Sequence, residues 1–248
     1  MKNKYWAKNK YSTVDPLDYE IARFRTNAGK LIDEAEKRAV LDLLLNSGID
    51  YKKDFKILDA ATGPGRLAFY LSDHLREAKI TGVDINENML RRAREIAGEK
   101  KVNINFIKGD IYHLPFQKAQ FDAVVGLRFS MHLPDIDSLI RELARVLKKD
   151  GILIFDIFNL KSILRLRSSG KNSKRQFSGW YNVSDLIDVS AQNGLEFVQK
   201  KGLFLCGETI LRTFPEKLLF ILSVFVRPPL FLQNFSTKIV LCFRKIEL

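Results

Sequence analysis

The chain has 248 residues, of which 46% are hydrophobic and 28% charged, a composition typical of a globular protein that excludes disordered and collagen-like chains. Its 41 Lys and Arg exceed its 29 Asp and Glu, and the formal charge of +12 first suggests a polyanionic partner such as nucleic acid. The excess is uneven, because residues 11–160 contain 23 basic and 23 acidic side chains. The surplus of positive charge lies in residues 1–10, 161–178 and 200–248, outside a formally neutral centre.

The first residues, Met1 to Val14, contain no apolar segment of the kind that a secretory signal needs, so we expect a cytoplasmic protein. No run of about 18 apolar residues predicts a membrane span. Cys206 and Cys242 are too few for a disulfide framework and have no metal-ligand spacing with a histidine, so we expect buried thiols and no metal site.

Helices and strands are expected to alternate along the first 160 residues. The hydrophobic patterns predict, in order, a helix over 31–45, a strand over 55–60, a helix over 65–75, a strand over 79–84, a helix over 86–97 ended by Gly98, strands over 102–108 and 121–126, a helix from Asp135 or Asp137 to Lys148, and a strand over 151–158. Strands joined by helices indicate a doubly wound α/β sheet, in which ligands bind at the carboxyl ends of the strands.

After residue 160 the pattern changes. A basic insertion over 161–182 precedes a helix over 183–193, and strands are predicted over 195–205 and 237–246. Between these strands, Leu218 to Val226 is a nine-residue run that is apolar except for Ser223, and it is too short to span a bilayer. We expect a buried crossover there, with an apolar lip for a lipid-like molecule or a membrane surface as the alternative.

The segment Ile57-Leu58-Asp59-Ala60-Ala61-Thr62-Gly63-Pro64-Gly65-Arg66-Leu67-Ala68 predicts a strand, a tight glycine-rich turn and a helix. Gly63, Gly65 and Ala68 match the G-x-G-x-x-G/A dinucleotide pattern, and Asp84 after the next strand is suited to a ribose hydroxyl. By itself this match is weak.

Two acidic residues favour S-adenosylmethionine over a dinucleotide. Asp59 would repel a pyrophosphate but suits the cationic amino end of a methionine moiety. Asp110, in Lys108-Gly109-Asp110-Ile111, follows a third strand, where it can meet an adenine amino group. The intervals from Asp59 to Asp84 and from Asp84 to Asp110 are 25 and 26 residues, one strand–helix unit each.

With these features the sequence resembles the class I S-adenosylmethionine-dependent methyltransferases, on the small-molecule or quinone-type branch. The matching segments are ILDAATGPGRLA, ITGVDINENML, IKGDIYHLPF, FDAVVGLRFSMHLPD and LARVLKKDGILIFDIFN, in the family's order over about residues 50–160. The resemblance implies a Rossmann-like, mostly parallel seven-stranded sheet with an antiparallel C-terminal hairpin. We interpret 1–248 as one domain, with N-terminal cap helices in 1–50, a cofactor-binding core in 51–160, and a C-terminal helix and hairpin in 183–248.

The resemblance also implies the cofactor site. It assigns Asp59, Ala61, Gly63 and Gly65 to the glycine-rich motif, Asp84 to the ribose, Asp110 and Ile111 to the adenine, and Leu127 to a position near the sulfur. Ile85 and Met89 are expected near the adenosine, with helix packing as the alternative. Ala61 stands where the family usually has its first glycine, and we expect this methyl group to be a small change.

Methyl transfer needs mainly positioning and exclusion of water, and a base only if the acceptor must lose a proton. Of the three histidines, His132 lies after the fourth predicted strand and is our candidate base, with a structural role as the alternative; His113 is expected near the cleft and His74 in solvent. The N-terminal aromatic residues are candidates for a lid over an apolar or planar acceptor, with helix packing onto the sheet edge as the alternative: Tyr5, Trp6, Tyr11, Tyr19 and Phe24. Arg23 or Arg25 is a candidate for a contact with the cofactor carboxylate.

The predicted function is transfer of a methyl group from S-adenosylmethionine to an O or C nucleophile of a small, hydrophobic or lipid-linked metabolite. Peripheral contact with an anionic membrane is a further expectation. The alternatives are methylation of RNA or of an RNA-associated protein, which the sequence favours less, and a non-catalytic cofactor-binding regulatory module.

Overall fold

The computed structural model describes residues 14–50, 54–162, 179–205 and 226–247. Its helices are α2 (Pro16–Phe24), α3 (Asn27–Leu45), α4 (Arg66–His74), α5 (Glu87–Lys100), α6 (Ile136–Val146) and α8 (Val183–Gln192), with 3-10 helices η1 (Ser130–His132) and η3 (Leu230–Phe235). Its strands are β1 (Lys56–Ala60), β2 (Lys79–Asp84), β3 (Asn105–Lys108), β4 (Phe121–Gly126), β5 (Leu147–Asn159), β6 (Trp180–Tyr181), β7 (Leu195–Leu203) and β8 (Lys238–Lys245).

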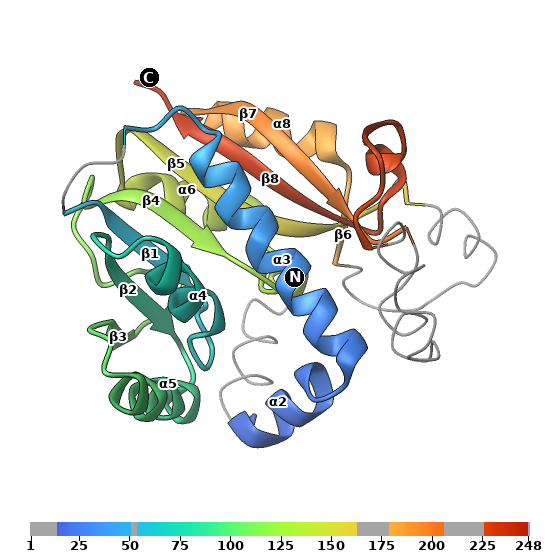
Figure 1. Cartoon of the computed structure of the whole chain (residues 1–248). Helices are drawn as coiled ribbons and strands as arrows, with labels where there is room; N and C mark the ends of the chain where they lie inside the picture. The colour runs from blue at the N-terminus through green and yellow to red at the C-terminus, as the bar shows by residue number, and fades with distance from the viewer. Residues whose placement is uncertain (1–13, 51–53, 163–178, 206–225, 248) are drawn as a thin grey trace.

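The strands form one sheet in the order β3-β2-β1-β4-β5-β8-β7, with β6 paired to β5 (Figure 1). The strands β1 to β5 run parallel, and β8 is antiparallel to both β5 and β7. This confirms the doubly wound α/β sheet and its antiparallel C-terminal hairpin. The sheet has eight strands rather than the expected seven, because the two-residue β6 lies within the predicted basic insertion and adds to β5.

Two hydrophobic cores lie on the two faces of the sheet. On one face, α3, α4 and α5 pack through residues such as Leu44, Leu71 and Leu90, each fully buried. On the other face α6 and α8 pack through residues such as Leu143 and Leu186. In the view of Figure 1, helix α3 crosses in front of the sheet, and α6 and α8 lie behind the sheet. Burial on both faces explains why the central strands have nearly continuous apolar runs.

Several predicted element boundaries were wrong: α3 begins at Asn27 rather than at residue 31, and β3 begins at Asn105 rather than at residue 102. Helix α5 does not end at Gly98 but continues to Lys100, and Lys101 ends it in the left-handed conformation at φ 55°. Helix α6 ends at Val146 rather than Lys148, because Leu147 already pairs with Phe121 as the first residue of β5. The Lys148–Gly151 segment, which was expected to separate the helix from the strand, is an irregularity inside β5.

The predicted crossover at 218–226 lies outside the described residues except for Val226, which is buried. The basic loop lies outside them from 163 to 178, as do Tyr5, Trp6, Tyr11 and Cys206. Cys242 is buried in β8, and burial raises the pKa of its thiol to about 12, as expected for an inert core cysteine. Within the described residues, no helix is long and apolar enough to cross a membrane and no cluster of side chains could hold a metal ion.

Candidate active site

The glycine-rich turn lies between β1 and α4 and has three residues with positive φ. Ala61 has φ 55°, Gly63 φ 55° and Gly65 φ 83°. The turn is held by the Thr62 amide, which donates to the Val83 carbonyl at 2.9 Å, and by the Gly65 amide, which donates to the Thr62 carbonyl at 3.0 Å. Because Ala61 is in the left-handed region, its methyl group costs about 1–2 kcal/mol relative to a right-handed conformation. Alanine in place of glycine at this position therefore has a larger conformational cost than the sequence suggested.

The two glycines of the turn have different roles. A Cβ on Gly63 would meet nothing within 4 Å, because this residue faces open space in the cleft. A Cβ on Gly65 would lie 2.8 Å from the Phe69 ring and 3.1 Å from the Phe106 ring. Gly65 therefore brings α4 close to the sheet and lines neither cavity of the cleft, whereas Gly63 lines both.

Asp84 joins the ends of β1 and β2. Its carboxylate accepts hydrogen bonds from the Gly63 amide at 2.8 Å and from the Asn86 amide at 2.9 Å. Burial raises the pKa of this carboxyl group above its usual value, and the amide hydrogen bonds oppose the increase. The side chain thus organises the turn and also faces the cavity.

Asp59 lies at the end of β1 and is almost completely buried, with 1% of its surface exposed. The Thr62 hydroxyl donates to its carboxylate at 2.5 Å. Burial raises the pKa of Asp59 to about 7, although this hydrogen bond and one from the Ala68 amide lower it. Asp59 lines a small cavity of about 30 Å³ that shares Tyr19, Gly63 and Leu127 with the main one.

The third acid, Asp110, follows β3. Its carboxylate accepts from the Tyr112 amide at 3.1 Å, and its carbonyl accepts from the His113 amide at 2.9 Å. The preceding Gly109 donates its amide to the Asp84 carbonyl at 2.9 Å, so the loops after β2 and β3 are hydrogen-bonded to each other. The three predicted acids therefore gather at one edge of the sheet.

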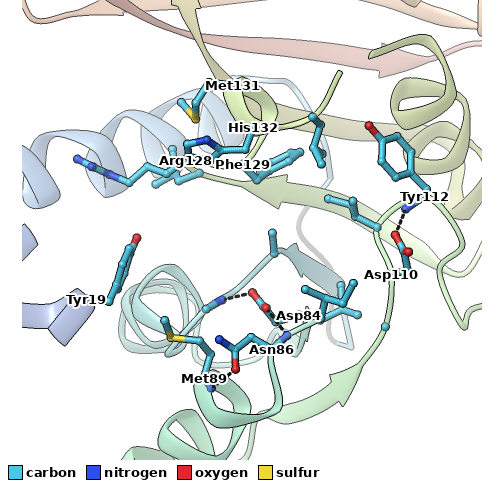
Figure 2. Close-up of a pocket in the computed structure, with 18 of the residues that line it drawn as sticks. Tyr19, Asp84, Asn86, Met89, Asp110, Tyr112, Arg128, Phe129, Met131 and His132 are labelled. Carbon is cyan, nitrogen blue, oxygen red and sulfur yellow. Dashed lines mark hydrogen bonds between the residues drawn. The ribbon is translucent and has the colours of Figure 1, made fainter. Parts of the chain in front are cut away.

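The main cavity has a volume of about 420 Å³, within the usual range for small-molecule sites. In Figure 2, Asp84, Asn86 and Met89 lie across the cavity from Phe129, Met131 and His132. Nine of the eleven predicted site residues line it: Ala61, Gly63, Asp84, Ile85, Met89, Asp110, Ile111, Leu127 and His132. Of the other two, Asp59 lies in the adjoining small cavity and Gly65 behind the turn.

Helix α2 covers one end of this cavity with Tyr19 and Arg23 (Figure 2 shows Tyr19). Arg25, the other arginine considered, is exposed and does not line it. Phe24 does not line it either; the Arg66 guanidinium lies 3.8 Å from the centre of its ring. The lid prediction thus applies to Tyr19 among the described aromatic residues.

Four largely buried charged side chains are joined beside the cavity, and we call them the charge ring; two of them, Arg128 and Lys238, line the cavity. The Arg128 Nε donates to Glu36 at 2.7 Å, and the other Glu36 oxygen pairs with the Lys238 ammonium. Lys238 also pairs with Asp156 at 3.0 Å, and Asp156 accepts the Arg128 amide at 2.6 Å. Each carboxylate thus has two cationic or amide partners, as buried carboxylates require.

Comparisons with known proteins agree with this geometry. A family described as "Methyltransferase domain" matches residues 57–151. The match runs from the second residue of β1 to Gly151 in β5 and includes Asp59, Asp84 and Asp110. Residues 57–151 thus contain a methyltransferase domain, in agreement with the resemblance to the class I S-adenosylmethionine-dependent methyltransferases.

Two relatives illustrate the match. A malonyl-[acyl-carrier protein] O-methyltransferase from Geobacter sulfurreducens is 33% identical over 130 residues, which are 52% of this chain and 47% of that protein. A ubiquinone/menaquinone biosynthesis C-methyltransferase from Rhizobium leguminosarum is 31% identical over 150 residues, 58% of each chain. The chain thus spans about half the length of these curated relatives.

One solved structure shows the shared fold. The phosphoethanolamine N-methyltransferase 2 of Haemonchus contortus, in complex with S-adenosyl-L-methionine, superposes with a TM-score of 0.59 at 18% identity, covering 95% of this chain and 61% of that one. S-adenosylmethionine is the cofactor of this family, as the sequence predicted. The residues present fit it: the cavity is large enough, Gly63 leaves room at the turn, and three carboxylates face the ligand space.

The charge ring was not predicted from the sequence. Its members are separated by up to 202 positions in the sequence. They come from helix α3, from strands β5 and β8, and from the turn that follows β4. The sequence did indicate one buried charge, because Asp156 interrupts the apolar run Ile152-Leu153-Ile154-Phe155-Asp156-Ile157. A charge in a buried strand needs a partner. The partner itself could not be identified without the tertiary structure.

The histidines lie as the sequence suggested. His132 ends η1 and lines the cavity, and His113 lines it from the loop after β3. His74 is exposed at the end of α4, where its Nδ1 lies 2.8 Å from the Tyr70 carbonyl oxygen.

Proposed function

We propose that this protein transfers the methyl group of S-adenosylmethionine to an O or C nucleophile of a small, hydrophobic or lipid-linked metabolite in the cytoplasm, at or near a membrane face. The observation that carries the proposal is the continuity of one cavity. It extends from Asp84 and Asp110 at the strand ends to an apolar wall formed by Phe129, Met131 and Phe158. The relatives named above, an O-methyltransferase and a C-methyltransferase, support both kinds of nucleophile.

The cofactor-side residues have separate proposed roles. Asp84 holds the ribose hydroxyls, and Asp110 with Ile111 contacts the adenine. Ile85 and Met89 pack against the adenosine, and Asp59 faces the cationic amino group of the methionine moiety. Leu127 lies near the sulfur, since it lines both the main and the small cavity. Gly65 acts indirectly, by allowing α4 to approach Phe106.

The bound cofactor supplies an activated methyl group on a sulfonium, so that the sulfur keeps the electron pair of the broken S–C bond. The protein's contribution is to hold the acceptor in line with that bond and to exclude water, which α2 and the apolar wall provide. Where the acceptor must lose a proton, we assign its removal to His132, which lines the cavity across from Asp84.

Labelled methyl transfer to fractionated cell extract tests this proposal. The protein is incubated with methyl-labelled S-adenosylmethionine and extract, which is then separated into organic-soluble, RNA and protein fractions. We expect the label in the organic-soluble fraction. Label in RNA or protein would instead support the nucleic-acid alternative, and cofactor binding without any labelled fraction would support the regulatory module.

Two variants make the assignment specific. Asp84→Ala should lose cofactor affinity measured by calorimetry, by about tenfold or more, because both the ribose contact and the turn depend on it. His132→Asn should keep cofactor affinity and lose about 100-fold or more of the transfer rate if it removes a proton. Unchanged cofactor binding in Asp84→Ala would contradict the named site.

A further inference from the structure

Two adjacent apolar side chains stand out on the surface near β8. Leu230 is 84% exposed and Phe231 is 76% exposed, the highest values among the exposed large hydrophobic residues of the described chain. Phe235 and Leu160 are also exposed, at 44% and 40%. We call these four residues the apolar tip. Exposed apolar patches of this kind commonly mark an interaction surface.

The apolar tip has a fixed backbone. Leu230, Phe231 and Phe235 lie on η3, which follows Pro228 and Pro229, and Leu160 directly follows β5. The Gln233 side chain accepts from the Gly202 amide of β7 at 3.1 Å, and the Asn159 side chain donates to the Asn234 carbonyl at 2.9 Å. The exposed side chains are therefore held outward by a segment that is hydrogen-bonded to the sheet.

The apolar tip lies at the same edge of the sheet as the cavity. Asn159 ends β5 next to Phe158, and Phe158 pairs with Lys238 across β5 and β8. Both Phe158 and Lys238 line the cavity. In Figure 1, η3 is the dark red segment that projects beyond the ends of β7 and β8 at this edge.

The surroundings of the apolar tip are basic. Arg227 and Lys161 are exposed beside it. The two described segments that form it, 158–162 and 226–238, contain no Asp or Glu. Projecting apolar side chains flanked by cations suit the surface of an anionic bilayer, where the apolar groups enter the acyl boundary and the cations meet the headgroups.

We propose that the apolar tip docks this protein on an anionic membrane surface, with the edge that contains the cavity toward the lipid. The proposal extends the proposed function, since it would bring a lipid-linked acceptor to the cavity. It does not require methyl transfer, so vesicle binding and transfer activity can fail separately. A protruding tip favours a bilayer over a second copy of the chain, which would need a complementary hollow.

Vesicle sedimentation of the full chain tests the proposal. The vesicles contain phosphatidylglycerol and phosphatidylcholine in equal parts, or phosphatidylcholine alone. We expect binding to the anionic vesicles that weakens with added salt, and weaker binding to the neutral ones. The double variant Leu230→Ser/Phe231→Ser should bind the anionic vesicles at least about tenfold more weakly, because it lacks the two large apolar side chains that would move from water into the bilayer.

The matched control is Leu45→Ser. Leu45 is 53% exposed at the far end of α3, next to the Ser47 carbonyl that accepts from Arg244 at the opposite end of β8. It should bind vesicles like the unchanged chain. Calorimetric cofactor affinity and thermal unfolding show whether each variant is folded.

Three results would overturn the proposal. The first is equal binding of the double variant and the unchanged chain. The second is no preference of the unchanged chain for anionic vesicles. The third is a dimer in sedimentation velocity that the double variant dissociates, without vesicle binding, since this would assign the apolar tip to a second copy.

Discussion

At the scale of single residues, the pKa of Asp59 leads to a pH-dependent affinity. Because burial raises this pKa to about 7, the carboxyl group of the free protein is largely protonated below pH 7, and its proposed cationic partner requires the ionised form. We expect cofactor affinity to rise about tenfold per pH unit below pH 7 and to level off above it. Calorimetry from pH 6 to 8 measures this, and Asp59→Asn should remove the slope.

The same residue should affect stability in the opposite direction. The folded-state pKa of Asp59 is raised above its ordinary value of 3.8, so between about pH 4 and 7 the folded state binds more protons than the unfolded state. The free energy of unfolding therefore falls as pH rises through that window. Without cofactor, Asp59→Asn should unfold at a higher temperature than the unchanged chain at pH 8, by a few degrees. A lower temperature would show that the Thr62 hydrogen bond outweighs desolvation.

At the scale of elements, α2 and α3 differ in how firmly they are held. Helix α2 has one buried residue, Pro16, whereas α3 buries ten, including Ile32 and Val40. The start of α2 is tied to the cofactor side by the Asn86 side chain, which donates to the Val14 carbonyl at 3.0 Å. Since Tyr19 and Arg23 line the cavity, a ligand there would add contacts to α2.

Hydrogen exchange followed by mass spectrometry tests this difference. In the free protein, the amides of α2 should exchange faster than those of α3, because few buried contacts oppose local opening. Saturating S-adenosylmethionine should slow exchange in α2 while α6, which packs on the other face, stays unchanged as the internal control. Equal protection of α2 with and without cofactor would count against its role as a cover.

At the scale of the whole molecule, the charge ring joins four elements that are far apart in sequence. Lys238→Met would leave Glu36 and Asp156 buried with one cation fewer, so we expect a loss of about 3–5 kcal/mol in the free energy of unfolding. Lys201→Met is the matched control, since Lys201 also pairs with an acid of α3, Asp42, but both side chains are 35% exposed. It should lose at most about 1 kcal/mol.

Urea unfolding measures both losses. The double variant Glu36→Gln/Lys238→Met should lose less free energy of unfolding than the sum of the losses in the two single variants. It removes a negative and a positive charge together, whereas each single variant leaves a buried charge with one partner fewer. Similar losses for Lys238→Met and Lys201→Met would mean that the charge ring does not stabilise the packing of α3 on the sheet.

Much of the cofactor side could be predicted because it depends on local sequence. Each strand, its terminal acid and the following turn are contiguous, as in Ile57 to Gly65, and parallel strands bring their carboxyl ends to one edge. The ends of elements were less predictable. Whether Leu147 continues a helix or begins a strand depends on its pairing with Phe121, which is a tertiary contact.

The sequence by itself determined the order of most strands and helices, the methyltransferase domain over residues 57–151, and the gathering of Asp59, Asp84 and Asp110, because hydrophobic period and motif spacing are local properties. Only the tertiary structure decided that Gly65 serves packing, that Ala61 has a left-handed backbone, that four largely buried charges meet beside the cavity, and that Leu230 and Phe231 are left exposed. These features depend on which surfaces meet when distant segments pack, and local periodicity does not encode such pairings.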